Sequence, residues 1–257
     1  MRIVDTHAHL HFSHFKGDLE HLVGRFSSDG IEFVINVGID VDDSTESLNL
    51  ASKFSSIFCS VGVHPHEASK VERDYIQKLK KLAESPKVIA IGETGLDYYR
   101  NFSSKEDQKR VFQEQLLLAK ELDLPVIIHI RDAYEDAYEM ISKIGLPNAG
   151  GVIHAFSADT SWALKFIEMG CFIGIGGPLT YPKNISLKNV VRAIGIENIV
   201  TETDCPYLPP QQFRGKRNEP AYVRFVVEEI SRILNEDPKE ISTQLLQNAR
   251  ELFSINQ

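Results

Sequence analysis

The sequence predicts a single (β/α)8 barrel, and three observations support this fold class. Strand-like and helix-like segments alternate along the whole chain, in eight consecutive units. The strand-like segments are short and apolar without polar alternation, which is typical of parallel strands buried on both faces. A length of 257 residues suits an α/β barrel closed by right-handed crossovers. An open doubly wound sheet is the alternative, but no glycine-rich phosphate loop follows the first strand. Since no linker or low-complexity segment interrupts the sequence, we expect one domain over residues 1–257.

Each element follows from its own local pattern. Short runs rich in β-branched residues predict strands, and apolar residues at helical spacing predict helices. Gly30 and Pro86 end two of those helices. The expected strands lie at 3–9, 32–37, 57–63, 88–92, 125–128, 151–153, 171–175 and 198–203. The expected helices lie at 17–29, 42–54, 72–85, 105–122, 133–144, 160–169, 187–194, 222–234 and 239–253.

Composition narrows the class of protein. A formal net charge of −8 argues against a broad, charge-driven grip on nucleic acid, although acidic metal ligands would contribute to that count. We find no apolar run long enough for a membrane span and no secretory signal, so we expect no membrane partner and a cytoplasmic location. Cys59, Cys171 and Cys205 lie far apart without C-x-x-C spacing, which favours buried thiols in a reducing compartment.

Polar side chains gather where the expected strands end. His7 and His9 are spaced i, i+2, so on a strand their imidazoles point the same way. The carboxyl ends of barrel strands meet at one rim, where barrel active sites are built. The residues that this topology brings to that rim are His7, His9, His64, Glu93, His129, His154 and Asp204.

Imidazoles and carboxylates at one barrel mouth predict a metal site. A lone strand histidine is usually a hydrogen-bonded core residue, Glu93 alone could be an ion-pair partner, and Asp204 alone a helix cap. Several unpaired groups of this kind together are costly to bury unless something compensates them. Such donors suit Zn²⁺, Mn²⁺, Fe²⁺ or Ni²⁺, and Mg²⁺ more weakly. They exceed what one ion needs, so we expect two divalent ions about 3.5–4 Å apart, bridged by Glu93.

Seven segments, in order along the chain, carry a resemblance to a known family. They are Asp5-Thr6-His7-Ala8-His9, Gly62-Val63-His64-Pro65, Gly92-Glu93-Thr94-Gly95-Leu96-Asp97-Tyr98, Pro125-Val126-Ile127-Ile128-His129-Ile130-Arg131, His154-Ala155-Phe156-Ser157, Glu202-Thr203-Asp204-Cys205-Pro206-Tyr207-Leu208 and Arg217-Asn218-Glu219-Pro220. The chain resembles the TatD family of metal-dependent deoxyribonucleases, a branch of the amidohydrolase superfamily. Thr203 and Cys205 stand where relatives often have serine and alanine, which puts substrate detail in doubt but not the site.

The resemblance implies a ligand set and an activity. One ion would be held by His7, His9, Glu93 and Asp204, and the other by Glu93, His129 and His154. The activity implied is hydrolysis of phosphodiester bonds in DNA, removing nucleotides from a 3′ end, with RNA as a further substrate.

We expect Glu93 and Asp204 to be the catalytic residues, with Asp204 accepting a proton from the attacking water. We expect His64, Arg131 and Arg217 to bind the substrate, Arg131 through its planar fork. A salt bridge to Asp132 or Asp97 is an equally good expectation for Arg131.

The loop at residues 211–218 is locally basic and could grip a nucleic-acid backbone while Phe213 or Tyr207 stacks a base. A solvated loop that leads into a helix at Glu219-Pro220 is the simpler interpretation.

Two rival functions remain open. One is a metal-dependent amidohydrolase or lactonase acting on a small C–N or ester substrate. The other is a non-catalytic metal-binding scaffold.

Overall fold

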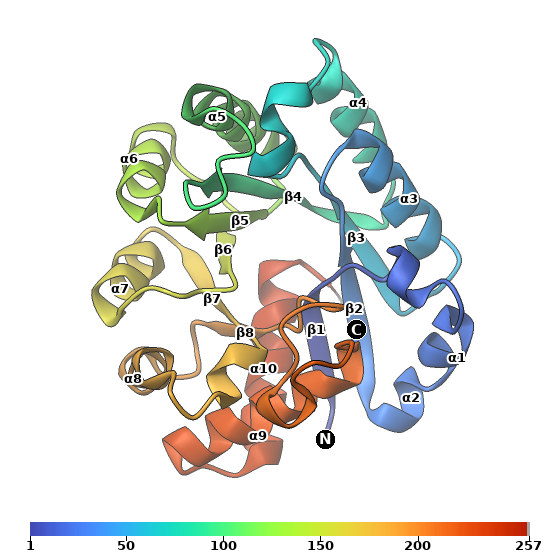
Figure 1. The fold of residues 1–257 in the computed structure, drawn as a ribbon, viewed down its shortest axis with the longest axis vertical. Helices are drawn as coiled ribbons and strands as arrows, with labels where there is room; N and C mark the ends of the chain where they lie inside the picture. Colours follow the sequence, from blue (N-terminus) through green and yellow to red (C-terminus); the bar gives the residue numbers. More distant parts are fainter. Residues whose placement is uncertain (256–257) are drawn as a thin grey trace.

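The computed structural model describes residues 1–255 and confirms the barrel. Eight parallel strands form one sheet in the order β1-β2-β3-β4-β5-β6-β7-β8, and helices surround it (Figure 1). The strands are β1 Ile3–Ala8, β2 Ile31–Val37, β3 Ile57–Val61, β4 Val88–Asp97, β5 Val126–Arg131, β6 Gly151–His154, β7 Cys171–Ile175 and β8 Ile199–Thr201. Because neighbouring strands in the sheet are also neighbours in the sequence, all eight carboxyl ends lie at one rim.

The helices follow the strands in the expected alternation. They are α1 Leu19–Gly24, α2 Phe26–Asp29, α3 Val41–Ala51, α4 Tyr75–Leu82, α5 Lys105–Leu122, α6 Tyr134–Ile144, α7 Thr160–Glu168, α8 Ile185–Ile194, α9 Val223–Leu234 and α10 Pro238–Leu252. Several begin at a short polar side chain that accepts a hydrogen bond from the first turn, as Asp40, Ser104 and Asp159 do. No helix in residues 1–255 is long and apolar enough to cross a membrane.

The structure refines several of the expected boundaries. The helix expected at 17–29 is divided at Arg25, whose backbone N–H bonds to Leu22 and tightens the turn there. Part of the helix expected at 72–85 is irregular, and a 3-10 helix, η2 (Pro65–Lys70), precedes it. β4 continues beyond Glu93 to Asp97. Further 3-10 helices are η1 Ser13–Phe15, η3 Gly177–Thr180, η4 Gln211–Phe213 and η5 Pro220–Tyr222.

Side chains help to join β1 to β8, where the barrel is nearly closed. The hydroxyl of Thr6 donates to the carbonyl of Thr201 at 3.1 Å, and that of Thr201 donates to Val4 at 3.1 Å. The buried carboxyl of Asp5 accepts from the Thr203 backbone N–H at 2.9 Å and from its hydroxyl at 2.5 Å. This seam holds the start of the chain against the end of β8, and it thereby sets His7 beside the last strand.

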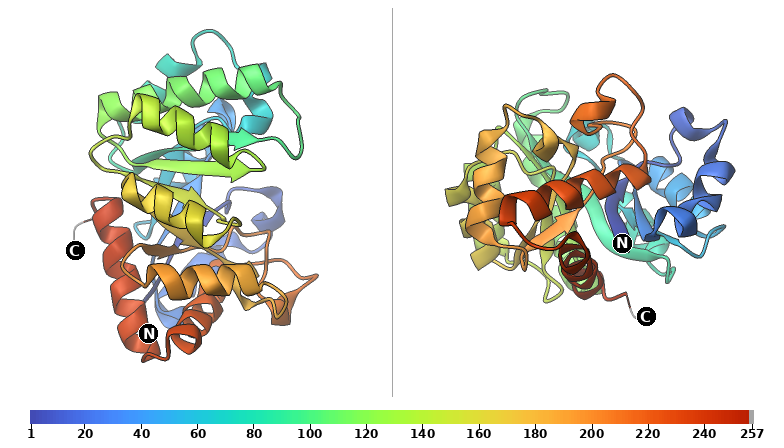
Figure 2. Two further views of the ribbon diagram at one scale, coloured as in Figure 1. Left: turned by 90° about the vertical axis from the view of Figure 1, so that its left-hand side faces the viewer. Right: turned by 90° about the horizontal axis from the view of Figure 1, so that it is seen from below.

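The N-terminal end of the barrel is apolar and is covered by α10. Interior side chains from six strands pack there with four residues of the C-terminal region: Val4, Phe33, Ile35, Val37, Ile89, Ala90, Ile127, Val152 and Val200 against Leu246, Ala249, Leu252 and Phe253. Figure 2 shows α10 at one side of the barrel, near the N-terminus. This packing fills the N-terminal end of the barrel, opposite the rim that carries the polar side chains.

Candidate metal centre

Seven predicted side chains meet at the C-terminal rim, around Glu93. The Glu93 carboxylate lies 3.3 Å from His7 Nε2, 3.5 Å from His64 Nε2, 2.9 Å from His129 Nδ1 and 4.0 Å from His154 Nε2. Asp204 Oδ1 lies on the other side of the cluster, 3.5 Å from His9 Nε2 and 3.8 Å from His154 Nε2. These side chains come from the first, third, fourth, fifth, sixth and eighth strand-helix units, so only the closed topology brings them together.

Two glycines make room for this cluster. Gly95 in β4 has φ +138°, and a Cβ there would lie 2.0 Å from the carbonyl oxygen of His129. Gly174 in β7 faces the Glu202 carboxylate, where a Cβ would lie 2.6 Å from Oε2. A larger residue at Gly95 would displace the backbone of β5, and one at Gly174 would displace the Glu202 carboxylate from its place beside His154.

Three groups of atoms in the cluster are close enough to hold a metal ion. They are His7, His9 and Asp204; His64, Glu93 and His129; and His7, His154 and Glu202. The first matches three of the four ligands expected for one ion. In the second, His64 stands where the resemblance implies His154, whose Nδ1 lies instead 3.0 Å from Glu202 Oε2.

The buried nitrogens of His7 test whether a cation fits here. Neither has a hydrogen-bond partner within residues 1–255, and the ring is stacked on His154 with centroids 3.4 Å apart. A buried polar atom without a partner is costly. Imidazole nitrogens facing carboxylate oxygens form a donor set of the kind that divalent transition metals bind. The residues present therefore fit a metal ion.

The electrostatics favour positive charge at three of the five rim histidines, whereas burial lowers the pKa of His7 and His64. Burial lowers the pKa of His9, His129 and His154, but the adjacent carboxylates outweigh it and raise all three, that of His154 to about 10. Burial raises the pKa of Glu93, yet His64, His7 and His129 hold it well below its usual range. Glu93 is thus ionised at neutral pH. A potential that stabilises imidazolium stabilises a bound cation in the same way.

His64 has a defined proton arrangement. Its Nδ1 accepts a hydrogen bond from the His66 backbone N–H at 3.1 Å, so the neutral ring carries its proton on Nε2, facing Glu93. Burial lowers the pKa of His64 well below its usual range. His64 is therefore neutral at pH 7 and presents a hydrogen-bond donor to the site.

Asp97, His66 and Glu202 complete the surroundings of the cluster, although none of them was predicted as a site residue. The carboxylate oxygen Oδ2 of Asp97 lies 3.2 Å from His129 Nε2 and 2.8 Å from His66 Nε2. Burial raises the pKa of Asp97, but His129, the Arg100 N–H and His66 outweigh it and lower it. Spacing could have indicated one of them, because Asp97 follows Glu93 by four residues within β4 and even spacings share a strand face. His66 lies in η2 and Glu202 lies beyond the end of β8, so no strand periodicity links them to the predicted residues.

The two predicted substrate arginines differ in their surroundings. Arg131 lies at the end of β5, its guanidinium carbon 3.8 Å from the centroid of the Tyr99 ring. It has no carboxylate within 4.0 Å in the part of the chain that the structure describes, so neither expected salt bridge forms. Both terminal nitrogens of Arg217 instead contact the Asp18 carboxylate, at 2.8 and 2.6 Å. Its role in substrate binding stays a prediction, with Asp18 occupying the fork.

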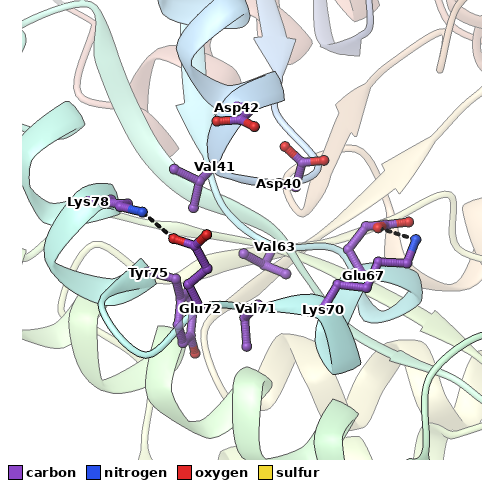
Figure 3. Close-up of a pocket in the computed structure, with 10 residues that line it drawn as sticks. All are labelled: Asp40, Val41, Asp42, Val63, Glu67, Lys70, Val71, Glu72, Tyr75 and Lys78. Atoms are coloured by element: carbon purple, nitrogen blue, oxygen red, sulfur yellow. Dashed lines mark hydrogen bonds and ion pairs between the residues drawn. The ribbon is translucent and has the colours of Figure 1, made fainter.

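A separate cavity of about 250 Å³ opens between α3, η2 and α4 (Figure 3). Its two lysines are paired with acids of the same lining: Lys70 Nζ lies 2.6 Å from Glu67, and Lys78 Nζ lies 2.5 Å from Glu72. None of the seven rim residues lines this cavity. This cavity is therefore separate from the candidate metal centre.

Known proteins match this chain along its whole length. A family model described as TatD related DNase matches residues 4–254. The uncharacterized metal-dependent hydrolase YabD of Bacillus subtilis is 38% identical over 254 residues, which cover 99% of this chain and 100% of that protein. The 3′-5′ ssDNA/RNA exonuclease TatD of Salmonella typhimurium is 33% identical, with 98% of each chain covered.

Solved structures of known proteins match the fold of this chain. The crystal structure of YjjV, a TatD homologue from Escherichia coli, superimposes with a TM-score of 0.92 at 31% identity, covering 99% of both chains. An organophosphorus hydrolase variant from Deinococcus radiodurans, with a TM-score of 0.68 at 11% identity, shares the fold alone. The resemblance found in the seven sequence segments is confirmed, and the chain belongs to the TatD family of metal-dependent hydrolases.

Proposed function

We propose that this protein hydrolyses phosphodiester bonds of single-stranded DNA from the 3′ end, with RNA as an alternative substrate. The observation that carries the proposal is the cluster of five imidazoles and two carboxylates, with Glu93 at its centre, at the open end of the barrel. The printed activity of the Salmonella relative, a 3′-5′ exonuclease on ssDNA and RNA, supports the choice of substrate.

We assign one divalent cation to His7, His9, Glu93 and Asp204 and a second to Glu93, His129 and His154. Bound there, the cations would lower the pKa of a water molecule and neutralise phosphate oxygens. Mg²⁺, Mn²⁺ and Zn²⁺ are the candidate ions. The close approach of His64 to Glu93 makes it a neighbour of the second ion, and its Nε2 proton makes it a donor rather than a ligand.

Asp204 is the group to accept the proton from the attacking water. Burial raises its pKa, but the hydrogen bond to His9 and the charges of His154 and His7 outweigh this and lower it. The carboxylate is therefore ionised and able to accept a proton. Glu93 stays ionised throughout and holds His129 and His7 in place.

Two further residues would bind the phosphate. His64 presents its Nε2 proton to a non-bridging oxygen, and Arg131 presents the edge of a guanidinium held flat on Tyr99. Since Arg217 is bound to Asp18, we assign it to holding the loop after β8 against the start of α1.

A nuclease assay on defined ends tests the proposal. The purified protein with Mg²⁺ or Mn²⁺ should shorten single-stranded DNA from its 3′ end, chelator should stop it, and Glu93→Gln should abolish it. A 5′-labelled strand reveals the ladder of 3′ removal, and a 3′-phosphorothioate strand controls for direction. Undiminished activity of Glu93→Gln would overturn the mechanism. Turnover of lactones or cyclic amides with no cleavage of DNA or RNA would replace it by the small-molecule alternative.

A further inference from the structure

Aromatic side chains gather at the rim that carries the metal centre. Three are strongly exposed within residues 1–255: Tyr99 (57%), Phe102 (65%) and Tyr207 (48%). All three lie in the loops that follow β4 and β8, the strands that lead to Glu93 and Asp204. Exposed aromatic groups at a functional opening indicate a binding surface, because water contact with such rings is otherwise unfavourable.

The first group, which we call the β8 shelf, consists of Phe12, His14 and Tyr207. The backbone N–H of Tyr207 donates to the carbonyl of Asp204 at 2.8 Å. Its ring meets Phe12 and His14 edge-on, with centroids 6.4 and 6.0 Å apart. Phe12 in turn is stacked on the candidate ligand His9 at 4.7 Å and 14°. A continuous series of rings thus runs from solvent to the metal centre.

Arg217 forms hydrogen bonds beside the β8 shelf. It donates to the carbonyl oxygen of His14 at 2.8 Å while its fork holds Asp18. These contacts fix the backbone that carries His14, and a partly ordered surface lowers the entropy cost of binding.

The second group, which we call the β4 shelf, consists of Tyr99 and Phe102. The Phe102 ring packs edge-on against His66 at 4.8 Å, and His66 contacts Asp97 behind the candidate ligand His129. Tyr99 carries the Arg131 guanidinium on its face. This side combines exposed rings with a cation that has no carboxylate within 4.0 Å among residues 1–255.

The two shelves lie on opposite sides of the metal centre. In the strand order β1 to β8 of a nearly closed barrel, β4 and β8 are separated by three strands in either direction. Figure 1 shows them across the barrel from each other. A chain whose phosphate reaches Glu93 and Asp204 would therefore pass both shelves.

We propose that the β8 shelf and the β4 shelf stack unpaired bases on either side of the scissile phosphate, so that the site selects a single strand with separated bases. This inference rests on the proposed nuclease function and names how its substrate is held. Aromatic faces accept any base, whereas bases inside a duplex are already stacked and cannot lie on them. A net charge of −8 argues against a broad, charge-driven grip on nucleic acid, so stacking would supply part of the affinity.

Two matched strands, one with bases beside its 3′ end and one without them, separate the effect of stacking from that of catalysis. Tyr207→Ala and Phe102→Ala should each raise the KM for a short oligothymidylate about 5- to 150-fold, the range for one lost base–aromatic contact. The same variants should leave unchanged the KM for a strand whose bases beside the 3′-terminal phosphates are replaced by tetrahydrofuran. Tyr207→Phe should retain the wild-type KM. Leu164→Ala, which removes an exposed apolar side chain of α7, is the matched control and should leave the KM for both strands unchanged.

A binding measurement distinguishes failure of this inference from failure of the proposed function. Glu93→Gln protein with Mg²⁺ should quench the fluorescence of a strand with 2-aminopurine beside its 3′ end, and adding Tyr207→Ala should remove that quenching. If wild-type protein cuts no strand but the quenching is present, the shelves stand and the nuclease proposal fails. If wild-type protein cuts DNA but the aromatic variants change neither KM nor quenching, the stacking proposal is wrong. It is also wrong if these variants raise the KM for both strands equally. A change of oligomeric state in Tyr207→Ala with no change in DNA affinity would assign the rings to a contact between copies instead.

Discussion

The two ends of this barrel are built from the same eight strands and have opposite chemistry. At the N-terminal end, apolar side chains such as Ile35 and Val152 pack against Leu246 and Leu252 near α10. At the C-terminal end, the buried side chains are ionisable, with Glu93 at the centre. Apolar packing closes the N-terminal end. At the C-terminal end, the cost of burying ionisable groups is offset by pairs of opposite charge. The contrast separates the part of the molecule that stabilises the fold from the part that can perform chemistry.

The largest expected effect comes from removing a charge at the polar end. Asp204→Asn keeps the shape of the side chain but cannot accept a proton, so we expect DNA hydrolysis to fall about 10²- to 10⁴-fold. The free energy of unfolding should change less than it does in the α10 variant described next. Hydrolysis rates and urea denaturation measure the two quantities. Activity within a factor of ten of wild type would remove Asp204 from the proton transfer.

The reciprocal change is made at the apolar end. Leu252 is 2% exposed, and Leu252→Ala should lower the free energy of unfolding by about 2–5 kcal/mol through lost contacts and a residual cavity. The activity of the folded fraction should be unchanged. Because the two sites share no partners, their effects on stability should add in the double variant Leu252→Ala/Asp204→Asn. A strongly non-additive result would mean that the two ends are coupled.

A smaller effect is expected one contact away from the ligands. Asp97→Asn weakens the acceptor that orients His129 and should reduce metal affinity or activity about 10- to 100-fold. Metal titration followed by calorimetry measures the affinity directly. Asp136→Asn is the control, since that carboxylate contacts Tyr98 and Lys109 outside the cluster. Equal affinity in the two variants would limit Asp97 to a structural role.

The smallest effect concerns the thiols. Burial raises the pKa of Cys59 and Cys171 to about 12, with Lys87 opposing the shift at Cys59, and burial also raises that of Cys205. At pH 8 all three stay protonated in the folded protein, and unfolding returns them to an ordinary pKa, so only the unfolded chain has an appreciable thiolate fraction. Ellman's reagent should therefore label none before denaturation and three after it. Rapid labelling of the folded protein would show that one of these segments opens.

The polar rim could be foreseen from the sequence because position along a strand fixes position in a parallel barrel. His7, His9, His64, Glu93, His129, His154 and Asp204 each follow or end a β-branched run, and the structure brings all seven together. The same alternation predicted the fold and the helix Lys105–Leu122 with its observed bounds. Local pattern determines such features, since strands and helices depend on neighbours in sequence.

Pairing across the rim could not be foreseen in the same way. Nothing near Arg217 in the sequence indicates that Asp18, almost two hundred residues away, fills its fork. For Arg131 the sequence left open a phosphate contact or a salt bridge, and its guanidinium lies over the ring of Tyr99 instead of pairing with Asp132 or Asp97. Asp97, His66 and Glu202 gain their places only because β4 extends, η2 turns His66 inward and Gly174 leaves space for a carboxylate.

The sequence by itself determined the barrel, the rim and the chemical type of the site, because these depend on the order and periodicity of residues along one chain. The tertiary structure alone decided which nitrogen of each histidine faces which carboxylate, which arginine is left without an acid, and that the exposed aromatic rings lie on opposite sides of the centre. Those features depend on distances between segments far apart in sequence, and only the closed barrel fixes such distances.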